Sequence, residues 1–248
     1  MSEAAQASPS TMSSSARGLQ HLILRRVWSA LWRHLPMLAV SSTVLTLGAS
    51  IGLRLAGGSQ LLVPILLALL AGPTTMALFN VVQGALVSDD TDLRTYLRGV
   101  WHTALPSTAH SLIPALCLGS LTAAADVYAR TSSAFMLVSL GTAIVATILS
   151  VAGFVVVLPL AVARPQVRGA MLWVTAWHIF GRWPVRFLAP IVMAGLALWG
   201  ALTYSSTLVL LLPAPIALLA GAAYWCCAVE LGARDVLVPG GATDGPAA

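Results

Sequence analysis

The amino-acid sequence predicts an all-α protein, a polytopic membrane bundle of six transmembrane helices arranged as three hairpins with cytoplasmic amphipathic connecting helices. Three observations lead to this prediction. Of the 248 residues, 58% are hydrophobic and only 8% are charged, whereas soluble domains carry about 25% charged residues. The apolar runs repeatedly reach the ~20 residues that cross the hydrocarbon core of a bilayer. The basic residues lie beside the ends of these runs.

The chain divides into a membrane domain, residues 17–238, and two tails. Residues 1–16 are rich in Ser and Ala without an apolar period, so we expect a disordered cytoplasmic tail there and a second one over residues 239–248. The expected spans are Pro36–Ala56, Leu61–Val87, Pro106–Ala125, Ala134–Ala163, Pro184–Tyr204 and Thr207–Val229.

The placement of the basic residues predicts the orientation. All 13 are arginine, and if both termini lie on the same side, only Arg54 and Arg130 fall on the opposite side. Cytoplasmic connections carry the excess of basic residues, so the sequence predicts a multi-pass cell-membrane protein with both termini cytoplasmic. Because the arginines are distributed over span ends and form no patch, the net charge of +5 does not indicate a nucleic-acid partner.

Each expected hairpin follows an aromatic residue that stands four or five positions before a proline. The pairs are Trp32 and Pro36, Trp101 and Pro106, and Phe180 and Pro184. Proline suits the first turn of a helix, and tryptophan suits the headgroup boundary. The pattern is either an internal repeat or the ordinary composition of a membrane boundary.

The connection between the second and third spans predicts an amphipathic helix over residues 90–104, parallel to the inner membrane surface. Its expected apolar face carries Leu93, Leu97, Val100 and Trp101, and its expected polar face carries Arg94 and Arg98. Asp89, Asp90 and Asp92 stand at its start, where the helix dipole favours acids. The helix either docks onto a cytoplasmic partner or anchors the bundle to lipid. The candidate docking residues are Arg94, Arg98 and Trp101.

Few polar side chains lie inside the spans. Asn80 and Gln83 are one helical turn apart, and such amides either bond across helices or line a substrate path. His110 is the only ionisable residue well within a span. It serves either hydrogen-bonded packing or proton coupling. Glu230 and Arg234 have the spacing of a local helix ion pair.

The sequence carries none of the common catalytic motifs. A nucleotide-binding loop, zinc-ligand spacing, a nucleophile motif and paired carboxylates are all missing, and the three cysteines lie in apolar segments. We therefore predict a non-enzyme without catalytic residues, metal or cofactor.

The segment from Gly72 to Leu78, GPTTMAL, resembles the Gly-Pro-(small)-(small)-x-Ala-Leu signature of the YesL-like family of bacterial membrane proteins. The similarity extends from about Trp28 to Val229. In this segment Pro73 should kink the helix, Gly72 should let a neighbouring helix approach, and Thr74 or Thr75 should bond the freed carbonyls.

The resemblance implies a helical bundle that is associated with carbohydrate uptake. We therefore expect an accessory or regulatory component that binds the lipid bilayer and a carbohydrate ABC transporter or a related membrane complex. The alternatives are a membrane permease subunit and a small-solute transporter that works through His110, Asn80 and Gln83.

Overall fold

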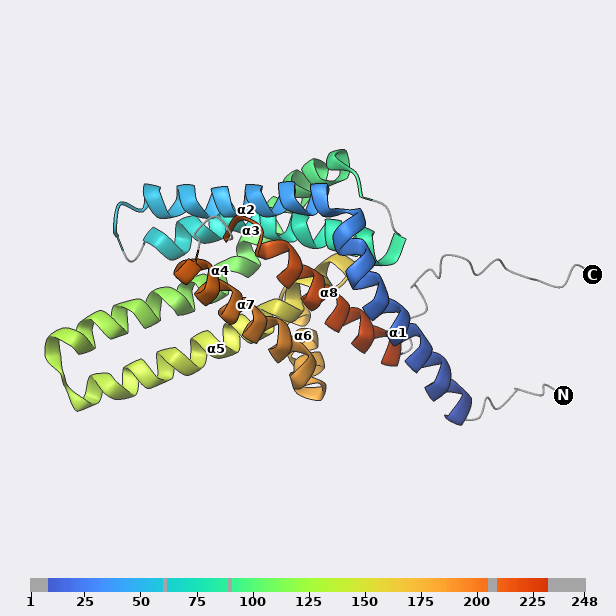
Figure 1. Ribbon diagram of the computed structural model, residues 1–248. Coiled ribbons are helices and arrows are strands. Elements are labelled where there is room, and N and C mark those ends of the chain that lie inside the picture. Colours follow the sequence, from blue (N-terminus) through green and yellow to red (C-terminus); the bar gives the residue numbers. More distant parts are fainter. Residues whose placement is uncertain (1–8, 60–61, 89–90, 205–208, 232–248) are drawn as a thin grey trace, which may run out of the picture.

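The computed structural model describes residues 9–59, 62–88, 91–204 and 209–231, and these ranges contain helices and no strand (Figure 1). The predicted all-α class is therefore confirmed. The elements are α1 (Pro9–Arg33), α2 (Leu35–Leu55), α3 (Leu62–Gln83), the π-helix η1 (Gly84–Ser88), α4 (Leu93–Thr131), α5 (Ala134–Ala163), α6 (Ala170–Arg182), α7 (Pro184–Tyr204) and α8 (Pro213–Glu230).

The long apolar helices correspond to the predicted spans. Helices α2, α4, α5, α8 and the continuous α3–η1 segment are long and apolar enough to cross a membrane. Helix α7 has the predicted bounds of the fifth span but passes this test only together with α6, and the pair is bent by 97°. The chain is thus a multi-pass helical membrane protein, and the described residues contain five helices that could be spans, or six if the bent pair counts as one.

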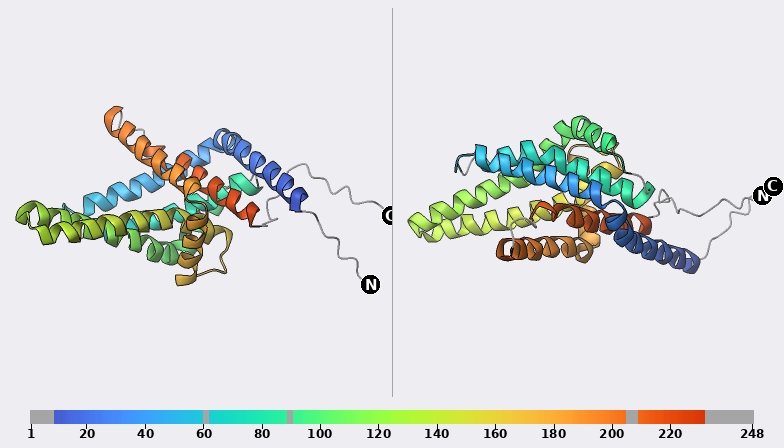
Figure 2. Two further views of the ribbon diagram at one scale, coloured as in Figure 1. Left: turned by 90° about the horizontal axis from the view of Figure 1, so that it is seen from below. Right: turned by 45° about the horizontal axis from the view of Figure 1, so that its top comes forward.

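The helices form three neighbouring hairpins. Figure 1 shows the α2–α3 and α4–α5 turns at one end of the molecule, whereas the start of α1 and the end of α8 lie at the other. We call these the turn end and the terminal end. Arg54 and Arg130 lie in the last turns of α2 and α4, at the turn end. Figure 2 shows the α4–α5 hairpin reaching beyond the other helices.

Helices α3 and α8 form the centre of the bundle. Helix α3 buries Leu78 and Val82, and α8 buries Leu218 and Cys227. Gly221 brings α8 close to α3, because a Cβ at this position would lie 2.8 Å from Val82 Cγ1. The hydrophobic core therefore lies where α3, α8 and the C-terminal half of α5 meet.

The first helix includes part of the segment over residues 1–16 for which we expected a disordered tail. Helix α1 begins at Pro9, while residues 1–8 and the second predicted tail lie outside the described ranges. Ile23 and Ala30 anchor α1 in the core. Once a helix is nucleated, each further residue adds one hydrogen bond, so the helix continues back through the Ser- and Ala-rich segment.

The predicted surface helix and the third span are not separate elements. Helix α4 runs without a break from Leu93 to Thr131 and contains Pro106 and Pro114. Pro106 therefore does not begin a helix, contrary to the prediction, and the internal-repeat alternative fails at this position. Proline is tolerated inside membrane helices because neighbouring groups can bond the carbonyl that it leaves free.

Helix α3 is also continuous through its proline. Pro73 lies in the interior of α3, and the backbone changes only after Gln83, where five residues adopt the π-helix η1. A π-helical turn inserts an extra residue into an α-helix and is frequent at functional sites. The predicted kink at Pro73 stays a prediction, whereas η1 was not predicted.

Candidate functional site

A pocket lies where η1, α3 and α4 meet near the end of α5. Its volume is ≈ 530 Å³. It is lined by Asn80, Gln83, Gly84, Val87, Ser88, Arg98, Gly99, His102, Thr103 and Val162. We call it the polar pocket, because six of these ten side chains carry hydrogen-bonding groups and none is acidic.

The backbone of α4 approaches α3 closely beside this pocket. A Cβ on Gly99 would lie 3.3 Å from Asn80 Nδ2, so glycine lets the Asn80 amide fit between the two helices. The other wall is the π-helix, whose Leu86 carbonyl accepts a hydrogen bond of 3.1 Å from Arg26 Nη1 of α1. Helix α1 is therefore tied to the π-helix by the hydrogen bond from Arg26.

The two amides predicted to pack or to line a substrate path both lie in the polar pocket. Asn80 and Gln83 are partly buried and line it together with Arg98. Gln83 Oε1 is buried and has no hydrogen-bond partner among the described residues. An unpartnered buried acceptor costs about 1–3 kcal/mol, so this oxygen calls for a donor that the described chain does not supply.

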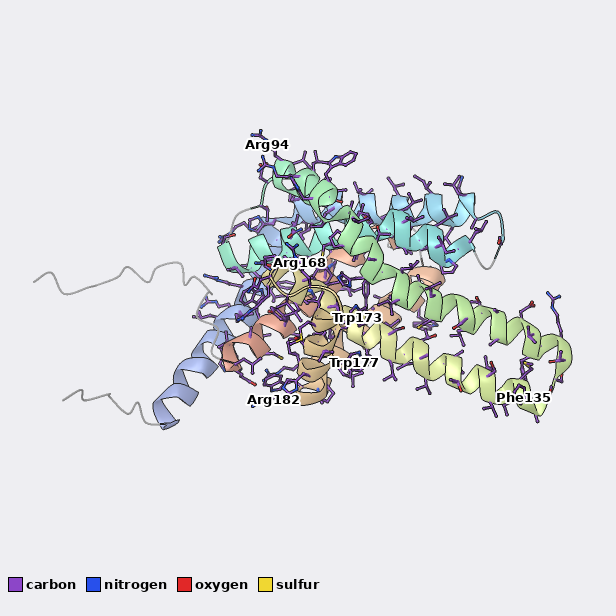
Figure 3. The ribbon with its side chains drawn as sticks, turned by 180° about the vertical axis from the view of Figure 1, so that it is seen from behind. Arg94, Phe135, Arg168, Trp173, Trp177 and Arg182 are labelled. Atoms are coloured by element: carbon purple, nitrogen blue, oxygen red, sulfur yellow. The ribbon has the colours of Figure 1, made fainter. Side chains whose placement is uncertain are left out.

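His110 is not a lining residue of the polar pocket. Trp173 Nε1–H of α6 donates a hydrogen bond of 3.1 Å to His110 Nδ1. Figure 3 shows Trp173 and Trp177 along α6. This hydrogen bond agrees with the packing interpretation of His110, and the proton-coupling alternative stays a prediction.

The Gly72 to Thr75 segment packs against α4 as the sequence suggested. A Cβ on Gly72 would lie 2.9 Å from Ser111 Oγ and 3.3 Å from the backbone of Thr108. Thr74 and Thr75 both donate to the Ala71 carbonyl, at 2.9 and 2.6 Å. Proline at position 73 instead frees the carbonyl four residues earlier, at Leu69, so neither hydroxyl bonds the group for which we expected it.

The start of α4 presents an apolar ridge away from the bundle. Trp101 is 83% exposed and Leu105 is 85% exposed, and Leu93 and Leu97 are exposed on the same face. The opposite face is anchored by Tyr96, which is only 1% exposed. We call Leu93, Leu97, Trp101 and Leu105 the α4 ridge.

The other residues predicted on the surface of this helix do not belong to the ridge. Arg94 and Arg98 are exposed beside it, and Figure 3 shows Arg94 at the free end of the helix. Val100 packs partly against the core and does not belong to the ridge. Asp92 is the N-cap residue but makes no capping hydrogen bond, and Asp89 and Asp90 lie outside the described residues.

A second polar cluster ties three helices together at the terminal end. Arg186 of α7 forms an ion pair with Glu230 of α8, which also accepts a hydrogen bond of 2.6 Å from Gln20 of α1. The local partner expected for Glu230, Arg234, lies outside the described residues. The observed partner is 44 positions away in sequence, which spacing alone could not indicate.

Sequence reasoning missed half of the six polar side chains that line the polar pocket. Ser88, His102 and Thr103 were not selected as candidates, although Arg98 and His102 have the i,i+4 spacing that places them on one helix face. Among the residues that the structure describes, no group of three metal-ligating side chains comes together.

The comparisons with known proteins add no relative. No family model, no curated protein and no solved structure matches this chain.

Proposed function

We propose that this protein is a non-catalytic accessory or regulatory subunit that docks onto the membrane-embedded part of a carbohydrate ABC transporter. The α4 ridge is the observation that carries the proposal. Four large apolar side chains at i,i+4 spacing stay exposed on a helix whose other face is sealed by Tyr96. Exposed apolar surface of this kind is typical of interaction sites.

The length of α4 favours a protein partner over lipid tails alone. Helix α4 has 39 residues and its hairpin partner α5 has 30, so α4 extends nine residues further, about 13 Å at 1.5 Å per residue. The ridge begins on this extension, with Arg94 and Arg98 beside it. Arginines that flank an apolar ridge suit the edge of an interface in a membrane complex. The partner covers the ridge there, while the guanidinium groups remain hydrated.

The choice of partner rests on the resemblance of residues 72–78 to the YesL-like signature. That family is associated with carbohydrate uptake, and a regulatory subunit needs no active site. The proposed orientation places both termini and the start of α4 in the cytoplasm, where eleven of the thirteen arginines would lie.

Co-purification tests the proposal. The tagged full-length protein, expressed in its native host and extracted in mild detergent, should recover a complete carbohydrate transporter. Recovery of an ATPase subunit alone, in equal amounts, would instead indicate that this chain is the permease. If no transporter component is recovered after cross-linking, the accessory function is wrong.

A matched pair of variants tests the ridge itself. Trp101→Ser removes an aromatic ring that is 83% exposed, and Phe135→Ser removes one that is 76% exposed at the turn end. Figure 3 shows Phe135 at the opposite end of the α4–α5 hairpin from Arg94. The Trp101 variant should lose the partner while the Phe135 variant keeps it, with equal amounts of both in the membrane.

A further inference from the structure

The polar pocket has the character of a ligand site. It lies on the side of α4 away from the ridge, and it joins side chains from α3, η1 and α4 around a volume of ≈ 530 Å³. Its lining includes two glycines, Gly84 and Gly99. A cluster of amides, hydroxyls and a guanidinium in a chain that is 58% hydrophobic needs a physical reason.

The charge of the described lining residues favours an anion. Arg98 and His102 stand one turn apart on α4, and no Asp or Glu is among the lining residues that the structure describes. Asn80 adds an amide N–H donor, which Gly99 allows to lie against α4. A planar guanidinium beside further N–H donors is the arrangement that binds phosphate oxygens.

The pocket also offers acceptors, which an anion alone would not use. Gln83 Oε1 is buried without a partner among the described residues. Ser88 and Thr103 donate their hydroxyl protons to the carbonyls of Gly84 and Gly99, at 3.0 and 2.6 Å. Their oxygens are therefore left as acceptors toward the pocket. A matching ligand combines a negative group with hydroxyl donors.

We propose that the polar pocket binds a glycerophosphate group, with the phosphate held by Arg98 and His102 and a hydroxyl donated to Gln83 Oε1. This chemistry occurs in two sources, the headgroup of phosphatidylglycerol and a soluble phosphorylated polyol. The π-helix shapes the wall that carries Ser88, and Arg26 holds this wall in place through the Leu86 carbonyl. The inference shares Arg98 with the docking proposal and otherwise rests on different residues.

The test uses the purified full-length protein and two forms of the probe. Isothermal titration calorimetry in detergent measures glycerol 3-phosphate, with glycerol and inorganic phosphate as partial probes. Native mass spectrometry measures retention of phosphatidylglycerol after transfer from nanodiscs that also contain phosphatidylcholine. Binding of glycerol 3-phosphate indicates the soluble source, and selective retention of phosphatidylglycerol without it indicates the lipid source.

Variants decide whether this pocket is responsible. His102→Ala and Gln83→Leu should each weaken binding about tenfold or more, because each removes one hydrogen bond to the ligand. Arg94→Ala, on the same helix but outside the pocket, should bind like wild type. Gly99→Ala changes no polar group of the pocket. It should nevertheless weaken binding, because its Cβ would displace the Asn80 amide.

Several results would overturn the inference. It fails if neither probe binds, if Arg94→Ala weakens binding as much as His102→Ala, or if inorganic phosphate binds as well as glycerol 3-phosphate. Trp101→Ser should bind the probe normally even where it loses the partner. The pocket and the ridge are thereby tested separately.

Discussion

Gly72 shows at the scale of one residue how little room separates α3 from α4. Its missing side chain leaves space for Ser111 Oγ, which would lie 2.9 Å from a Cβ at this position. Gly72→Ala should destabilise the protein by about 1–3 kcal/mol, because overpacking forces neighbouring helices apart. Thermal unfolding in detergent measures the effect.

A glycine in open surroundings serves as the control for Gly72. No atom lies within 4 Å of the position that a Cβ on Gly141 would take. Gly141→Ala should therefore leave the unfolding temperature unchanged or raise it slightly, since alanine is the better helix former. Equal losses in both variants would contradict the argument from close approach.

The ion pair between Arg186 and Glu230 gives a second prediction for single residues. Glu230→Gln should lower the unfolding free energy by about 1 kcal/mol, because the pair is partly exposed and links separate helices. Asp126→Asn breaks the more exposed pair with Arg130, within one helix, and should have almost no effect. High salt should reduce the difference between the Glu230 variant and wild type.

Sequence reasoning worked at this scale where the signal was local. The amides one turn apart and the glycine beside a proline predicted packing faces, and both lie against α4. The partner of Glu230 and the wall of the polar pocket formed by η1 depend on which helices meet. A single sequence does not contain that information at any fixed spacing.

Helix α4 shows at the scale of elements why boundaries were predicted less well than faces. Pro106 and the change from amphipathic to apolar composition suggested two helices, but the structure joins them. The ridge residues Leu93, Leu97 and Trp101 were nevertheless predicted on one face, because that face depends only on the helical period. Tertiary contacts through Tyr96 fix the start of α4 to the bundle.

The charges at the start of α4 distinguish docking from lipid anchoring. Arg94→Glu with Arg98→Glu should reduce recovery of the partner without changing the amount of inserted protein if the segment docks. If it only anchors the bundle to anionic lipid, the same change should lower stability in the membrane whether or not a partner is present. Each charge near such a surface is worth about 1 kcal/mol. His102→Ala, which alters the pocket only, should leave partner recovery intact.

The proline in α3 gives a further prediction for an element. Pro73→Ala restores an N–H that can bond the Leu69 carbonyl, so the predicted kink should disappear while insertion stays complete. Electron-paramagnetic-resonance distances between labels at Leu62 and Ser88 should lengthen. An unchanged distance would show that α3 is already straight in the wild type.

At the scale of the whole molecule, the sequence predicted the number and pairing of the hairpins. Apolar length alone located α5 and α7 at their observed bounds. It did not predict the 97° bend between α6 and α7, because Trp183 and Pro184 resemble any boundary between a connection and a span. After the bend, α6 packs against α5. A Cβ on Gly153 of α5 would lie about 3 Å from ring atoms of Trp173 and Trp177, so glycine at this position leaves room for the two rings.

The orientation in the membrane is the last prediction. Single cysteines placed in a background that lacks the three native ones should report it through labelling by an impermeant maleimide. Ser59, in the α2–α3 turn, should react from outside intact cells, and so should Ser205, which lies outside the described residues. Thr95 should react only after permeabilisation. The reason is the positive-inside bias: reversing the protein would place eleven of its thirteen arginines on the translocated side. Labelling of Thr95 with protection of Ser59 would invert the orientation and place the α4 ridge outside the cell, where a cytoplasmic partner could not reach it.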